Sequence, residues 1–64
     1  MAKFKIQCYN REMTTLVSEE NEDFYNIEVA VMEAFGKASA NAIIVLMRQS
    51  LNNPNSWKLV AKFY

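Results

Sequence analysis

The chain has no histidine and only one cysteine, one glycine and one proline among its 64 residues. Without histidine, neither a Ser-His-Asp nor a Cys-His nucleophile can be assembled, and the usual proton carrier of neutral-pH catalysis is missing. Cys8 alone excludes an internal disulfide, and one thiol without histidine supplies too few ligands for structural zinc. Gly36 alone excludes a glycine-rich phosphate loop. These absences predict a protein that is not an enzyme and binds no metal or cofactor.

Long hydrophobic segments are also missing. The longest unbroken apolar run, residues 42–47, covers six residues, whereas a membrane helix needs about 20. The first residues do not form the apolar region of a signal peptide, because Gln7, Asn10 and Arg11 interrupt them. Together with the unpaired cysteine, this pattern favours a cytoplasmic protein that does not bind membranes.

The length leaves room for one compact domain over residues 1–64. A chain of this size buries only about 60% of its unfolded surface. Because neither disulfides nor zinc can supplement such a small core, association is the remaining source of support. We therefore expect a dimer or a contact with another protein.

The N-terminal third alternates between apolar and polar residues, which is the period of a half-buried strand. In residues 3–9, Phe4, Ile6 and Cys8 share one side. Residues 13–18 repeat the alternation after a short turn. This predicts a hairpin whose second strand lies at the edge of a sheet.

From Asn21 the period changes to 3.6 residues, which predicts a helix. Asn21 suits the N-cap, Glu22 and Asp23 suit the positive end of the helix dipole, and Gly36 suits the C-terminal stop. The side chains expected on the buried face of this helix are Phe24, Ile27, Val31, Ala34 and Phe35.

Residues 38–53 allow two interpretations. The β-branched run at residues 43–45 favours a buried strand, whereas the flanking alanines suit a second helix. Because residues 57–64 alternate again, we predict an α+β fold of order ββαββ: a four-stranded, mostly antiparallel sheet with one helix packed on one face. The alternative is ββααβ, with residues 36–39 as a turn between helices. The expected core is Phe4, Ile6, Ile27, Val31, Phe35, Val45, Trp57, Leu59 and Phe63.

Charge is unevenly distributed although the net charge is zero. All seven acidic residues lie within residues 12–33, and none of the seven basic residues does. The outward positions of the predicted strands carry Lys3, Lys5, Tyr9, Lys58, Lys62 and Tyr64. A basic sheet face with aromatic rings is typical of proteins that bind single-stranded nucleic acid. Alternating lysines on an exposed strand also provide solubility and edge protection, so nucleic acid binding is the alternative function.

A second feature is a stripe on the flank of the predicted helix. Tyr25, Val29 and Met32 follow i, i+4, i+7 spacing away from the expected buried face, with Glu22 and Glu33 outside that face as well. The stripe is either covered by a curled sheet or forms a contact surface for another protein or a second copy.

The function that we expect is a non-enzymatic protein-binding module. It would inhibit or modulate a larger host protein, in the manner of small proteins from phages and mobile elements. A transcriptional regulator is a third option if residues 38–53 are helical.

Overall fold

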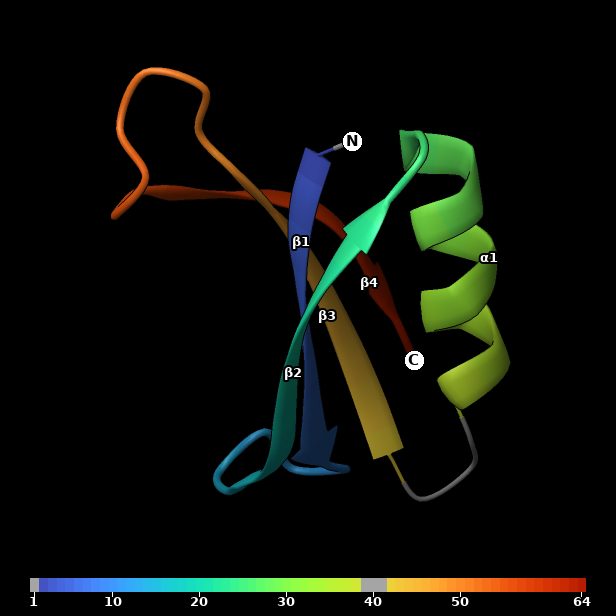
Figure 1. Cartoon of the computed structure of the whole chain (residues 1–64). Helices are drawn as coiled ribbons and strands as arrows, with labels where there is room; N and C mark the ends of the chain where they lie inside the picture. The colour runs from blue at the N-terminus through green and yellow to red at the C-terminus, as the bar shows by residue number, and fades with distance from the viewer. Residues whose placement is uncertain (1, 39–41) are drawn as a thin grey trace.

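A four-stranded sheet and one helix make up residues 2–38 and 42–64, which are the residues that the computed structural model describes (Figure 1). The elements are β1 (Ala2–Asn10), β2 (Leu16–Phe24), α1 (Ile27–Lys37), β3 (Ala42–Gln49) and β4 (Trp57–Phe63). The ββαββ prediction is confirmed. The ββααβ alternative is wrong, because residues 42–49 of the uncertain stretch form β3; residues 39–41 of that stretch lie outside the described residues.

The strands lie in the order β2-β1-β3-β4, and each neighbouring pair is antiparallel. β2 is therefore an edge strand, as predicted. The core face of the sheet carries Phe4 and Ile6 of β1 beside Ile44 and Leu46 of β3, and α1 covers this face (Figure 1). The opposite surface is the open face. Val45 is buried, as predicted, but it lies on the open face, so its predicted place between the sheet and the helix is wrong.

The helix begins later in the chain than the sequence predicts. β2 continues to Phe24, whose ring packs edge-on against Phe4 at a centroid distance of 5.8 Å. Pairing with β1 holds these residues in a strand, so Asn21, Glu22 and Asp23 do not start a helix. Asn26 is the N-cap: its backbone is extended and its Oδ1 accepts a hydrogen bond from the Val29 N–H at 2.9 Å.

The turn between β1 and β2 is longer than the sequence predicts. The Asn10 Oδ1 atom accepts hydrogen bonds from the backbone N–H groups of Thr14 and Thr15, at 2.9 and 3.2 Å. Met13 within this turn has a φ of 59°, in the left-handed region that favours glycine or asparagine. One asparagine side chain thus organises the turn and delays β2 until Leu16.

Two alanines form the buried face of α1. Ala30 and Ala34 are fully buried, and Val31 packs against the core beside them. Their small side chains allow the helix backbone to approach the sheet closely. Ile27 and Phe35, which the sequence pattern predicts in the core, lie at the sides of this close contact and are exposed.

An irregularity in β4 changes the side on which its first residues lie. Leu46 pairs with Ala61 but its neighbour Met47 pairs with Leu59, so Val60 is an extra residue in the β4 ladder. Phe63 and Ala61 keep the predicted core-face register, and Val60 also packs against the core. In residues 57–59, which precede the bulge, the alternation between the two faces is reversed. Leu59 and Trp57 therefore lie on the open face, and their predicted positions in the core are wrong.

Candidate protein-binding surface

Five large apolar or aromatic side chains lie exposed on or beside α1, and one of them is Ile27. We call the other four the outer helix surface: Tyr25, Val29, Met32 and Phe35. Tyr25 is 82% exposed, Met32 73% and Phe35 66%. Met32 is turned about 160° around the helix axis from the buried Ala30, because each residue advances about 100°. The structure therefore leaves Val29 and Met32 of the predicted stripe uncovered by the sheet, whereas Tyr25 precedes the N-cap Asn26 and is not on the helix as predicted.

Phe35 belongs to this surface although the sequence pattern places it in the core. Its ring contacts that of Phe63 at a centroid distance of 5.7 Å and an interplanar angle of 53°. The contact joins α1 to the last residues of β4 and extends the apolar surface over both elements. The i, i+4 spacing of Ala30 and Ala34 is the signal that could have predicted this. Because α1 packs on the sheet through Ala30 and Ala34, Phe35 lies to the side of this contact.

Acidic side chains surround the outer helix surface. Glu28 and Glu33 are exposed on the helix itself. On β2, Glu20 and Glu22 are exposed and pair with the core-face residues Ile6 and Phe4, so both lie on the helix side of the sheet. Glu20 Oε1 forms an ion pair at 3.3 Å with Lys37, on the last turn of α1. The apolar residues are thus bordered by carboxylates on the helix and on β2.

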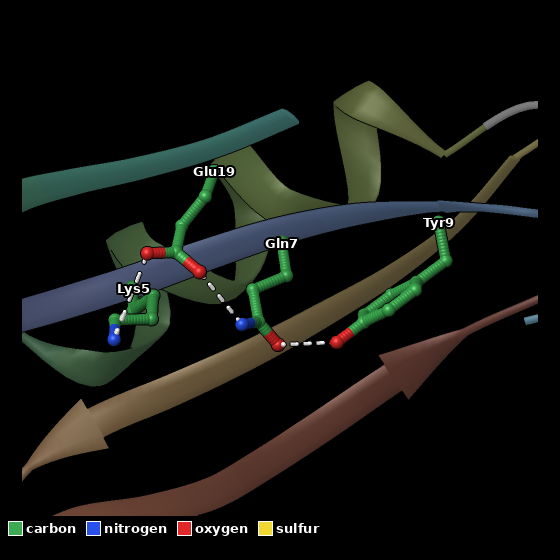
Figure 2. Close-up of polar contacts among 4 residues, drawn as sticks. All are labelled: Lys5, Gln7, Tyr9 and Glu19. Carbon is green, nitrogen blue, oxygen red and sulfur yellow. Dashed lines mark hydrogen bonds and ion pairs between the residues drawn. The ribbon is translucent and has the colours of Figure 1, made fainter. Parts of the chain in front are cut away.

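The open face carries a connected row of polar side chains (Figure 2). Tyr9 Oη donates to Gln7 Oε1 at 3.2 Å, and Gln7 Nε2 donates to Glu19 Oε2 at 2.8 Å. The other oxygen of Glu19 lies 3.8 Å from Lys5 Nζ, which also lies 4.4 Å from the centre of the Trp57 ring. Lys5 is therefore engaged by both a carboxylate and an indole.

This row also covers apolar residues of β3. Ile43 and Val45 pair with Tyr9 and Gln7 on the open face, yet both are buried. Because α1 lies on the other face, the long side chains of neighbouring strands shield them. Tyr9 is therefore part of a side-chain cover, and its side chain is only partly exposed.

The lysines expected to form one basic surface are divided between two faces. Lys3, Lys5 and Lys62 lie on the open face, where Lys3 is directly opposite Asp23 of β2. Lys58 pairs with Arg48, which pairs with Phe4, so the register assigns Lys58 to the core-face side. Tyr64 is exposed just beyond β4. The open face thus combines lysines with the carboxylates of β2.

Two features are absent from the described residues. Within residues 2–38 and 42–64, no three His, Cys, Asp or Glu side chains are grouped so that they could hold a metal ion. In the same part of the chain, the helix is too short and too polar to cross a membrane.

Comparison of the chain with protein-family models, with curated proteins and with solved structures finds no match.

Proposed function

We propose that this chain is a non-enzymatic protein-binding module that docks on a larger protein through the outer helix surface. The observation that carries the proposal is the exposure of Met32 and Phe35 on a helix whose packing is already completed by Ala30 and Ala34. An exposed side chain of this size contributes little to the core, and here the contribution is limited to the contact of Phe35 with Phe63. Such side chains gain about 25 cal/mol for each Å² of apolar area that a partner covers.

The chemistry of the surface favours a partner that is apolar at its centre and basic at its edge. Carboxylates of Glu22, Glu28 and Glu33 border the apolar residues, and Lys37 is already paired with Glu20. In a two-fold dimer this patch would meet its own copy, so the same carboxylates would face each other. Like charges across an interface oppose association, and a different protein with Lys or Arg at the rim removes this repulsion.

The size of the domain sets how much of it a stable partner must cover. A standard interface buries about 800 Å² on each side, and the described surface totals 4370 Å². About one fifth of the molecule would then be in contact. An 11-residue helix is about 16 Å long, so the contact must extend beyond α1. The Phe35–Phe63 contact and Glu22 on β2 identify the adjacent regions that would be included.

A protein that binds without chemistry of its own acts by covering or reshaping a site on its target. We therefore extend the proposal to an inhibitor or modulator of a larger protein, of the kind that phages and mobile elements encode. Its action would be stoichiometric, because each bound copy occupies one target.

The experiment uses two matched charge insertions, Met32→Lys on the outer helix surface and Val17→Lys on β2. Both replace an exposed apolar side chain, and lysine at position 32 lies four residues after Glu28, which favours the helix. Wild-type protein and both variants are immobilised and exposed to host lysate. Retained proteins are identified by mass spectrometry, purified and titrated by calorimetry. We expect Met32→Lys to weaken binding of the target by more than about 2 kcal/mol, about thirtyfold in Kd.

The controls separate loss of binding from loss of folding and from self-association. Circular dichroism of both variants should match the wild type, and Val17→Lys should keep the wild-type affinity. Sedimentation of the free protein should give the 7.4 kDa monomer. A target retained equally by Met32→Lys, or a wild-type dimer that this substitution dissociates, would contradict the proposal.

A further inference from the structure

Two basic side chains lie directly opposite each other near the loop that joins β3 and β4. Arg48 pairs with Lys58 in the register of these strands. Like charges in this position repel each other. In the described part of the chain the ion pairs are Lys5–Glu19 and Lys37–Glu20, so neither Arg48 nor Lys58 is neutralised by a carboxylate there. Arg48 and Lys58 therefore form a local excess of positive charge that no ion pair of the described residues balances.

A hollow of about 190 Å³ lies at this place. Its lining consists of Arg48, Gln49, Ser50, Leu51, Asn52 and Lys58. The acidic residues of the chain lie in the β1–β2 turn, on β2 and on α1, whereas this hollow is formed by β3, β4 and the loop that joins them. Because a water molecule occupies about 30 Å³ in the liquid, the hollow has room for a ligand larger than water.

The loop that forms one wall is held by its own hydrogen bonds. Its ends are joined by a bond from the Ser50 N–H to the Ser56 carbonyl at 2.8 Å. The Gln49 side chain donates to the Pro54 carbonyl at 2.9 Å, and Asn53 Oδ1 accepts from the Asn55 N–H at 3.0 Å. The wall is therefore preformed, which reduces the entropy that a ligand would lose by ordering it.

The side chain of Arg48 also carries a hydrogen-bond donor without an acceptor in the part of the chain that the structure describes. Its Nε atom is buried and has no hydrogen-bond partner among the described residues. A buried N–H without an acceptor is unfavourable in a folded protein. An oxyanion in the hollow would accept hydrogen bonds from the terminal N–H groups of the guanidinium and would supply a counter-charge to the Lys58 ammonium; the buried Nε would gain an acceptor only through a shift of the Arg48 side chain.

We propose that this hollow is a binding site for a phosphate group. Arg48 would bind two of its oxygens through the planar guanidinium, the geometry for which arginine is best suited. Lys58 would contribute a point charge from the opposite strand, and Ser50 and Asn52 line the remaining wall. Leu51 is highly exposed at the rim, where it would contact an organic group that carries the phosphate.

The test is a titration followed by ¹⁵N–¹H correlation spectra at constant ionic strength. Inorganic phosphate and phenyl phosphate are used as separate probes, which distinguishes a free anion from an ester. We expect saturable shifts confined to residues 48–52 and 58, and at least tenfold weaker binding in Lys58→Gln. Arg48→Lys keeps the charge but loses the guanidinium fork, and it should also bind at least tenfold more weakly.

Lys62→Gln is the matched control, because Lys62 lies on the same strand but pairs with Val45 on the open face. It changes the net charge by the same amount as Lys58→Gln and should bind phosphate with the wild-type affinity. Dispersed spectra show that each variant is folded. Shifts that do not saturate, or equal losses in Lys58→Gln and Lys62→Gln, would show that phosphate only screens the surface charge and would overturn the site.

Discussion

Replacement of Asn26 with alanine tests where α1 begins. The Asn26 Oδ1 atom accepts the Val29 N–H at 2.9 Å, and the asparagine backbone is extended with φ −153° and ψ 174°, as an N-cap requires. Alanine removes this acceptor. Because Val29 is exposed, water can reach the freed N–H, so we expect a loss of about 1 kcal/mol, in the middle of the range for such caps.

The assay is urea unfolding followed by circular dichroism, with thermal unfolding as a second measurement. A domain of this size is typically stable by about 3 to 10 kcal/mol, so the variant should stay folded. A loss of about 1 kcal/mol corresponds to about 4 to 8 °C in Tm. Asn26→Asp keeps a side-chain acceptor and should stay close to the wild type.

Asn21→Ala is the decisive control, because the sequence pattern alone assigns the N-cap to Asn21. In the structure Asn21 lies on β2 opposite Lys5 and is exposed. Its replacement should change stability by less than about 0.5 kcal/mol. If Asn21→Ala costs as much as Asn26→Ala or more, α1 does not begin after Asn26.

Four further predictions concern the packing and the surface. Leu46→Ala should cost about 2 to 5 kcal/mol in urea unfolding, because Leu46 is fully buried. Leu59→Ala should cost less than about 1 kcal/mol, since the bulge places Leu59 on the open face, where it is 58% exposed. Equal losses of stability in Leu46→Ala and Leu59→Ala would refute the bulge. Met13→Asn should raise stability by up to about 1 kcal/mol, because asparagine tolerates a φ of 59° better than methionine, and an unchanged midpoint would contradict this. Single-stranded oligonucleotides should not bind at physiological salt in fluorescence anisotropy, because Lys5 is engaged by Glu19 and Lys3 lies opposite Asp23; micromolar binding would restore the nucleic acid hypothesis.

The elements that could be predicted from the sequence are those whose pattern is local. β1 follows from the alternation of Phe4, Ile6 and Cys8, and β3 follows from the β-branched run at residues 43–45. The end of β2 could not be predicted in this way. Residues 19–24 have the composition of a helix start, and only their pairing with β1 makes them a strand. The helix start depends on this pairing as well, which is why the local pattern favours Asn21 over Asn26.

The candidate surface was predictable only in part. The i, i+4, i+7 spacing of Tyr25, Val29 and Met32 is enough to set these residues apart from the expected core. The pattern assigns Phe35 to the core, because a large aromatic residue on an apolar stripe is usually buried. No local feature of the sequence shows that Ala30 and Ala34 form the buried face of the helix in its place. It assigns Lys58 to the wrong face because the extra residue at Val60 reverses the alternation, and such a bulge depends on the facing strand.

The inner position of β1 has a consequence for how the chain folds during synthesis. β1 can form its hairpin with β2 early, but its other edge pairs with β3, which is complete only at Gln49. At about 5 to 20 residues per second, a ribosome needs roughly 1 to 5 s to proceed from Phe24, where the hairpin is complete, to Gln49.

For that interval the nascent hairpin has an unpaired strand edge, and Phe4 and Ile6 lack the β3 neighbours that bury them. Such an edge is a template for pairing with another chain. Premature termination before residue 42 would therefore release a product that aggregates, whereas a chain that includes β3 covers the same edge within itself.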